Sequence, residues 1–421
     1  MNKYRYIAFF LLWTLPAWGQ HTTLEEMNSL LEKKDFFTLK EKLSHTNTGL
    51  TTQDSLYFQA STQNALGNHQ QSIAAIKRLS QEYATQMDGN VWINLLNILA
   101  DDYIKIFDYK STAACYAILL RKYRSKLSRD DIASYDNNYQ LYKSLQNIAP
   151  QTVDFEGNKT VQMYRDEQNL WTLPITVNQK DTAHFIFDSG AGISTISSSA
   201  AQALGLRVIP VNITVSSANE RQIMAQLGVA AEMRIGGAVF RNAVFLVVDD
   251  AMLQFPTINY KIEGIIGFPV IHAMHTITIT RDGRLSINQP LGTANNANFY
   301  YQGNAIRILG IGGKDTLLFH LDTGAKQSEL NKEYYDGHKS EVRSLSEKRK
   351  YRLGSAGGVT SYKTFQYPNF TLQIGSGKKT LPYIPVYPKK VSPYGNAVGQ
   401  DYIQLFDKMC IDFDQCYVTF Q

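Results

Sequence analysis

Two aspartates of this 421-residue chain are followed by nearly identical short sequences. The first begins the segment Asp-Ser-Gly-Ala at Asp188, and the second begins Asp-Thr-Gly-Ala at Asp322, 134 residues later. Each follows an apolar segment, and the glycine two residues on permits a tight turn that presents the carboxyl group. Two carboxyl groups brought together share one proton: the charged one activates a water while the protonated one polarises a carbonyl.

The similarity between the two segments extends over much of the chain. Residues 175–191 align with residues 309–325 without a gap, and each copy later contains two apolar residues followed by glycine, ending at Gly267 and Gly399. These glycines follow their aspartates by 79 and 77 residues. An internal repeat of about 130 residues predicts a two-lobed domain with approximate two-fold symmetry, in which the aspartates face each other.

The elements that position these residues are expected to be strands. After Pro150 apolar residues alternate with polar ones, and glycine, threonine and β-branched residues become frequent. We therefore expect an N-terminal lobe at 151–290 and a C-terminal lobe at 291–421. The clearest strand candidates are residues 172–177, 183–187, 244–248, 276–280 and 285–287.

The preceding part of the chain has helical spacing. Residues 22–148 contain few glycines, which predicts an all-α domain at 20–150. Residues 57–83 align with residues 97–123 at a constant shift of 40, and their small residues resemble those of tetratricopeptide helix pairs. That family's usual period is shorter, about 34 residues. A binding surface for a partner protein and a plain helical support for the β-rich part are both open interpretations.

The region from Trp171 onward resembles the retropepsin-like branch of the pepsin-type aspartic proteases. The resemblance rests on the two aspartate motifs and on the elements that end at Gly267 and Gly399. The resemblance implies an all-β bilobal pepsin/retropepsin-like acid protease domain, preceded here by the all-α helical-repeat domain. It implies an aspartic endopeptidase that hydrolyses peptide or protein substrates as a monomer, with Asp188 and Asp322 as the catalytic pair and no cofactor or metal.

The resemblance also implies roles for the neighbours of the two aspartates. In that family the hydroxyl residue after each aspartate hydrogen-bonds across the two-fold axis. The residues expected to support the site are therefore Ser189, Gly190, Thr323, Gly324, Gly267 and Gly399. Ala191 and Ala325 stand where a hydroxyl group would otherwise stabilise the ionised aspartates, so we expect a raised pKa and activity at mildly acidic to neutral pH.

The family closes β-hairpin flaps over bound peptide, and two segments suit that role. They are residues 216–220 and 354–360, which share a Ser-Ala pair. The residues expected to contact substrate there are Ser217, Ala218, Ser355, Ala356 and Gly357. The first lobe has no clear equivalent of the flap tyrosine of pepsin.

Three competing motifs lack residues that their chemistry requires. Ser189 lacks the G-x-S-x-G context of a nucleophile elbow. The segment GIGGK at 310–314 lacks the Ser or Thr of a phosphate loop and predicts a hairpin instead. His272 and His275 are joined by no further cluster of metal-ligating residues, so a structural role is favoured.

The first 19 residues have the pattern of an export signal. Lys3 and Arg5 precede an apolar run that ends in Ala17-Trp18-Gly19, a plausible cleavage site. We therefore expect an exported, periplasmic or extracellular protein, and no later stretch is long and apolar enough to span a membrane. Cys410 and Cys416 flank an expected turn, and their pairing stays open because a tight hairpin there would set them out of register.

Composition narrows the choice of partners. The formal net charge is +5, and Lys3 and Arg5 of the expected export signal carry two of these charges, so the remaining +3 is too small to indicate a nucleic-acid partner. The basic residues at 348–352 are better explained as a solvated loop. The alternative to an enzyme is a catalytically silent peptide-binding protein that keeps the cleft and recruits a partner through its helical domain. Both aspartates, both hydroxyl neighbours and both glycines are present, which argues against that alternative.

Overall fold

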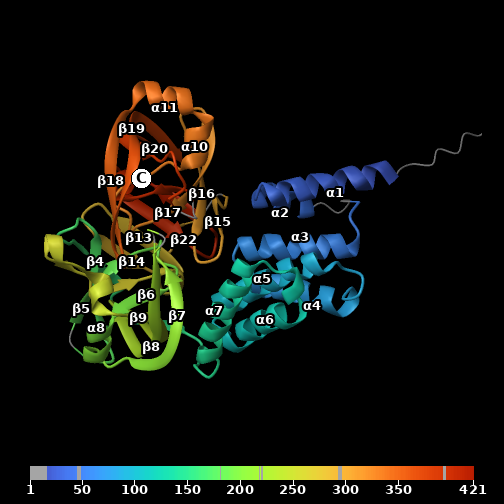
Figure 1. The fold of residues 1–421 in the computed structure, drawn as a ribbon, viewed down its shortest axis with the longest axis horizontal. Helices are drawn as coiled ribbons and strands as arrows, with labels where there is room; N and C mark the ends of the chain where they lie inside the picture. The colour runs from blue at the N-terminus through green and yellow to red at the C-terminus, as the bar shows by residue number, and fades with distance from the viewer. Residues whose placement is uncertain are drawn as a thin grey trace, which may run out of the picture.

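The computed structural model describes residues 17–44, 49–180, 182–217, 219, 221–292, 296–391 and 395–421. Residues 1–16 of the expected export signal therefore lie outside the described residues, and so does Ala218 of the first expected flap. Helices lie on one side of the molecule and two β-rich units on the other (Figure 1). We call residues 152–287 the first β unit and residues 299–420 the second.

The helical region consists of consecutive antiparallel helices. They are α1 (Ala17–Glu32), α2 (Phe36–Ser44), α3 (Thr52–Ala65), α4 (His69–Glu82), α5 (Gly89–Lys105), α6 (Tyr109–Lys122) and α7 (Arg129–Leu145), with a 3₁₀ turn at Arg124–Lys126. Side-chain caps from Thr51, Asp88 and Ser128 satisfy backbone N–H groups at the starts of α3, α5 and α7.

The shift of 40 residues found in the sequence maps helix pair onto helix pair. The α3–α4 turn contains Gly67 at φ +77°, and the α5–α6 turn contains Phe107 at φ +58°. Both turns thus use a left-handed residue at equivalent positions, although only one is glycine. The all-α character of the region is confirmed, whereas membership of the tetratricopeptide class stays a prediction.

The first β unit is built on a nine-stranded sheet with the order β1-β9-β6-β12-β5-β4-β8-β7 and β3 beside β4. Its elements are β1 (Thr152–Phe155), β2 (Thr160–Gln162), β3 (Tyr164–Arg165), β4 (Trp171–Val177), β5 (Thr182–Phe187), β6 (Ser194–Ser197), α8 (Ser198–Ala203), β7 (Arg207–Ser216), β8 (Gln222–Ile235), β9 (Ala238–Val248), β10 (Gln254–Phe255), β11 (Tyr260–Lys261), β12 (Gly264–Ile266), α9 (Phe268–His272), β13 (Thr276–Thr280) and β14 (Arg284–Ile287). All five strand candidates from the sequence lie in strands.

The second β unit contains a seven-stranded sheet with the order β18-β19-β16-β17-β21, with β15 beside β16 and β20 beside β19. Its elements are β15 (Phe299–Tyr301), β16 (Ile306–Gly312), β17 (Asp315–Leu321), α10 (Lys332–Gly337), α11 (Lys339–Leu345), β18 (Glu347–Ser355), β19 (Gly358–Ile374), β20 (Gly377–Val386), β21 (Asn396–Val398), α12 (Gln400–Ile403), β22 (Lys408–Asp412) and β23 (Tyr417–Phe420). The segment GIGGK forms the β16–β17 hairpin, as predicted.

A third sheet joins the two β units. Its order is β2-β14-β13-β22-β23, and β13 of the first unit pairs with β22 of the second, so that Ile277 lies opposite Ile411. One continuous apolar core extends through both units and includes Phe185, Phe245 and Phe319. Because this core is shared, the two units are held in a fixed relation to each other.

The remaining sequence expectations about cysteine, histidine and membrane spans have clear outcomes. Cys410 and Cys416 are both free thiols. Cys410 lies opposite Thr419 in the antiparallel pairing of β22 with β23, while Cys416 lies in the turn between these strands. His272 is packed against Phe268 and Tyr301, and His275 pairs with Asp414 at 3.0 Å. Within the described residues, no helix has the length and apolarity needed to cross a membrane.

Candidate active site

Each motif aspartate lies directly after a central strand. Asp188 follows β5, which pairs in parallel with β12, and its backbone N–H donates to the carbonyl of Ile266 at 3.0 Å. Asp322 follows β17, which pairs in parallel with β21, and its N–H donates to the carbonyl of Val398, also at 3.0 Å. The two apolar-Gly elements recognised in the sequence are therefore the strands beside the aspartate loops.

Backbone N–H groups fix the orientation of each carboxyl group. Oδ1 of Asp188 accepts hydrogen bonds from the N–H groups of Gly190 at 2.8 Å and Ala191 at 3.1 Å. Oδ1 of Asp322 accepts equivalent bonds from Gly324 at 2.8 Å and Ala325 at 3.0 Å. In each loop one carboxyl oxygen is thus held by the turn, and the two carboxyl groups lie close enough for the charge of Asp322 to raise the pKa of Asp188.

Four hydrogen bonds cross between the two loops. The N–H of Ser189 donates to Oγ1 of Thr323 at 2.9 Å, and the N–H of Thr323 donates to Oγ of Ser189 at 3.1 Å. The two hydroxyls donate in turn to the carbonyls of Leu321 and Phe187, each at 3.0 Å. Ser189 and Thr323 are each 1% exposed, so this network is shielded from water and fixes one loop against the other.

A side chain at either motif glycine would collide with the carboxyl group of the opposite aspartate. A Cβ on Gly190 would lie 2.5 Å from Cγ of Asp322, and a Cβ on Gly324 would lie 2.3 Å from Cγ of Asp188. Neither glycine has a positive φ, so each position requires glycine for space and not for a left-handed conformation. Each glycine instead lets the opposite carboxyl group approach its backbone.

The glycines after the neighbouring strands are also sterically required. A Cβ on Gly267 would lie 2.7 Å from the carbonyl oxygen of Ala191, and one on Gly399 would lie 2.8 Å from that of Ala325. Their N–H groups donate to Oγ of Ser194 and Oγ of Ser328, each at 3.0 Å. Sequence reasoning missed these two buried serines, although they are 134 residues apart and belong to the same repeat.

Burial changes the ionisation of the pair. It raises the pKa of Asp188 well above the ordinary value, and the negative charge of Asp322 raises it further. Burial likewise raises the pKa of Asp322, against the opposing effect of its backbone N–H donors. Because the two groups interact, they titrate as a pair, and one proton is retained to a higher pH than by an isolated aspartate.

Glu329 is a further titratable group near the pair that sequence reasoning missed. Its N–H donates to the carbonyl of Ala397 at 2.9 Å, in the strand that flanks the Asp322 loop. Burial raises the pKa of its carboxyl group to about 7, and the charge of Asp322 adds to the rise. The repeat places Thr195 at the equivalent position of the first unit, so comparing the two copies gave no signal for an acidic residue here.

Both expected flaps are tips of β-hairpins, and the two tips touch. The first connects β7 to β8, and the second connects β18 to β19. Nδ2 of Asn219 donates to the carbonyl of Gly358 at 3.2 Å, and the guanidinium of Arg221 donates to the carbonyl of Gly357. The contacts between the tips therefore come from Asn219 and Arg221, which the sequence comparison had not singled out.

Of the expected flap residues, only Gly357 takes part in these contacts among the described residues. The hydroxyl of Ser217 donates within its own turn, to Oδ1 of Asn219 at 2.5 Å, and the hydroxyl of Ser355 is 3.5 Å from the carbonyl oxygen of Ala356.

The described residues contain no group of three His, Cys, Asp or Glu side chains suited to a metal ion.

The comparisons with known proteins address the first β unit. A family model described as aspartyl protease matches residues 173–270, from β4 to α9, which is less than half of the chain. That match includes Asp188 and Gly267, and it leaves out Asp322 and the helical region. The first β unit is thus similar to aspartyl proteases.

Similarity to whole proteins is weaker than this family match. No curated protein matches. The matching solved structures include a retropepsin-like aspartic protease from Rickettsia conorii, which is 18% identical over 32% of this chain and 91% of that chain. Its TM-score is 0.22, so this likeness supports no conclusion about the chain.

Proposed function

We propose that this protein is an aspartic endopeptidase in which Asp188 and Asp322 activate one water between them. The cross-bonded loops carry the proposal, because they place the two carboxyl groups against each other, and two carboxyl groups this close share one proton. The charged member of such a pair takes a proton from the water, and the protonated member polarises the peptide carbonyl. The aspartyl-protease match of the first β unit supports the same chemistry.

In this proposal the two β units are the lobes of one retropepsin-like domain that arose by duplication. The equivalent loops, the parallel strand beside each loop and the serine below each strand support it. Substrate would lie as an extended chain beneath the two hairpins, held by backbone hydrogen bonds. We further propose that the protein is exported, which a mature N-terminus at Gln20 would support.

Peptide cleavage tests the proposal. The full chain is expected to cleave members of a mixed peptide library, and a statine-containing peptide, which mimics the tetrahedral transition state, is expected to inhibit it. Tight binding of the statine peptide without cleavage of any library member would favour the silent peptide-binding alternative.

The pH dependence of cleavage follows from the raised pKa values. The singly protonated pair is the active form, so activity falls at low pH when the pair gains a second proton and at high pH when it loses the last one. Because burial raises the pKa of both carboxyl groups, the alkaline limb lies above the ordinary Asp value of about 4. We expect a maximum of kcat/KM at mildly acidic to neutral pH, and a maximum below about pH 3 would contradict this account.

Replacement of Glu329 by Gln tests the electrostatic environment of the pair. Removing a neighbouring negative charge favours ionisation of the pair, so the alkaline limb of the profile should move down by roughly half a pH unit. The exposed Glu333 on α10 is a matched control, and Glu333→Gln should leave the profile unchanged. Equal profiles for the two variants would show that Glu329 does not influence the pair.

A further inference from the structure

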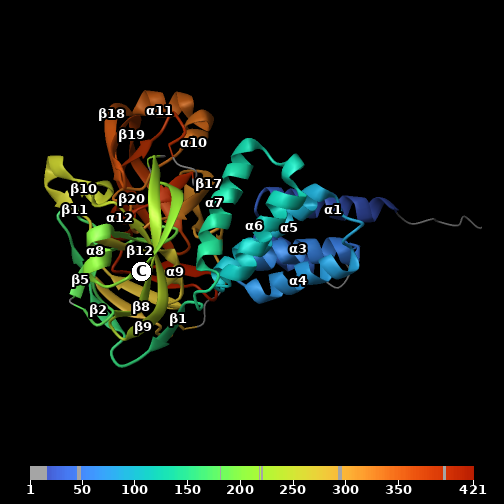
Figure 2. The same ribbon diagram turned by 60° about the horizontal axis from the view of Figure 1, so that its bottom comes forward.

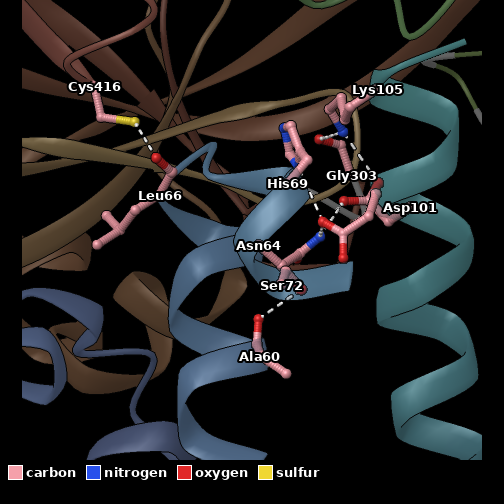
Figure 3. A network of polar contacts seen from close by, with 10 residues as sticks. Ala60, Asn64, Leu66, His69, Ser72, Asp101, Lys105, Gly303 and Cys416 are labelled. Atoms are coloured by element: carbon pink, nitrogen blue, oxygen red, sulfur yellow. Dashed lines mark hydrogen bonds and ion pairs between the residues drawn. The ribbon is translucent and has the colours of Figure 1, made fainter. Parts of the chain in front are cut away.

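Within the described residues, the helical region contacts both β units. Nζ of Lys105 at the end of α5 donates to the carbonyl of Gly303 at 2.8 Å and to Oδ1 of Asp101 at 3.0 Å (Figure 3). Sγ of Cys416 donates to the carbonyl of Leu66 at 3.4 Å. The side chain of Lys105 is 3% exposed, and Gly303 lies between β15 and β16. These contacts attach the helical region to the second β unit.

A contact between α7 and β7 attaches the helical region to the first β unit. Nδ2 of Asn137 donates to the carbonyl of Thr214 at 2.9 Å, and the N–H of Thr214 donates back to Oδ1 of Asn137 at 2.8 Å. One side-chain amide thus satisfies both backbone groups of a single strand residue. Figure 2 shows α7 between the other helices and the β units.

This contact falls on the edge of a sheet. β7 is the last strand in the order of the nine-stranded sheet, so its outer N–H and C=O groups have no neighbouring strand. Its pairing with β8 is also interrupted between Ile209 and Ile213. Asn137 takes the place of a partner strand directly after this irregularity.

Apolar packing reinforces the contact. Tyr135 and Tyr139 of α7 belong to the same continuous apolar cluster as Ile209, Val211 and Val215 of β7. The same cluster includes the buried Ile223 of β8, against which Gly357 of the second hairpin tip packs. The core of the helical region is therefore continuous with apolar residues of the first flap.

Thr214 is close to the tip of that flap. In the β7–β8 ladder it pairs with Met224, and only two further pairs separate it from the turn that carries Asn219 and Arg221. Asn219 and Arg221 are the residues that reach the second hairpin. A hydrogen-bonded anchor at Thr214 therefore restricts the part of the hairpin on which the contact between the tips depends.

We propose that Asn137 is a positioning residue for the first flap, and that the helical region holds the β7–β8 hairpin where its tip meets the second hairpin. The kinetic consequence rests on the proposed peptidase function, whereas the ordering of the hairpin does not. If Asn137 is lost, the arrangement in which the two hairpin tips meet becomes less populated. The apparent affinity for a bound peptide then falls in proportion to the population of that arrangement.

Variants of the full chain test this proposal. In Asn137→Ala we expect the KM for a cleaved peptide and the dissociation constant of a statine peptide to rise together by roughly three- to tenfold, with a smaller change in kcat. Amide hydrogen exchange should accelerate in residues 221–225 and remain unchanged in β5 and β17, beside the aspartates. Asn137→Asp keeps the shape but cannot donate to the Thr214 carbonyl, so it should show the same effects.

Asn138→Ala is the matched control, because Asn138 neighbours Asn137 on α7 and has no side-chain hydrogen bond within the described residues. It should behave as the unmodified protein does. Asn137 variants whose hairpin exchange or statine affinity equals that of the Asn138 variant would overturn the proposal. If the unmodified protein cleaves no peptide, the peptidase proposal fails, while hairpin exchange and statine binding still decide the role of Asn137.

Discussion

Replacement of Asp188 or of Asp322 by Asn is expected to lower kcat by about 10⁴-fold, the upper end of what a positioned acid or base contributes. An amide cannot take a proton from water or hold the shared proton. It can still accept the two backbone hydrogen bonds that hold Oδ1 in each loop, so the loop geometry should be retained. Steady-state cleavage of a peptide found in the library screen measures the loss.

Stability distinguishes this result from misfolding. The folded pair has raised pKa values, so the folded state binds more protons than the unfolded chain above about pH 4, and its stability falls as pH rises through the folded pKa. An Asn variant lacks one of these groups, so its free energy of unfolding at pH 7 should equal or exceed that of the unmodified protein.

The control for the aspartate variants is Asp315→Asn. Asp315 is partly exposed on β17 and pairs with His338 at 2.9 Å, so its loss should have little effect on stability or cleavage. Full activity in Asp188→Asn, or equal losses of activity in Asp188→Asn and Asp315→Asn, would contradict the proposed mechanism.

The second large effect is expected from Thr323→Val, which removes a hydroxyl group at nearly constant volume. The N–H of Ser189 would lose its acceptor, and the carbonyl of Phe187 would lose a donor, in a place that water does not reach. Each buried group left unsatisfied costs about 1–3 kcal/mol, so the free energy of unfolding should fall by about 2–4 kcal/mol. Denaturant unfolding measures this loss.

Cleavage should fall as well, because the hydroxyl of Thr323 sets the position of one aspartate loop against the other. A misplacement of reacting groups by 1 Å costs about 10²-fold, so we expect kcat/KM to fall by about that factor. Thr112→Val is the control, since the buried Thr112 donates only within its own helix, to the carbonyl of Asp108 at 2.9 Å. A Thr323 variant as stable and as active as the Thr112 variant would show that the cross-bonds are unimportant.

Local periodicity accounts for the parts of the fold that the sequence predicted. The change from helical spacing to alternation near Pro150 separates α7 from β1, and the repeat led directly to the two aspartate loops. The turn at Asn178 and Gln179 and the turn at Gly313 were predictable because each lies between two alternating apolar segments.

Contacts made only in three dimensions were not predictable from those patterns. Asn219 and Arg221 meet backbone carbonyls 139 and 136 residues away in sequence, and nothing in the first hairpin alone indicates them. The crowding at Gly190 was not predictable for the same reason, because it comes from Asp322 in the other unit. Asn137 is one of two adjacent asparagines, and only the position of β7 shows which of them binds it.

The sequence allowed the helical region to be either a binding surface for a partner or a support for the β-rich part. In the structure this region makes specific contacts with the β units. Lys105 and Leu66 attach it to the second unit and its neighbouring turns, while Asn137 attaches it to the first flap. These contacts favour a supporting role for the surfaces that face the β units. If Asn137 positions the first flap, a partner that displaced α7 would also release that flap.

Whether Asp188 and Asp322 share a proton can be measured by titrating the aspartate side chains. With aspartate labelled by ¹³C at Cγ, the signals lost in Asp188→Asn and Asp322→Asn identify the pair in the NMR spectrum of the unmodified protein. We expect these two carboxyl groups to titrate together and one proton to stay bound at pH 6, well above the ordinary Asp pKa of about 4. Two independent titrations near pH 4 would contradict this expectation, because carboxyl groups that ionise separately do not share a proton.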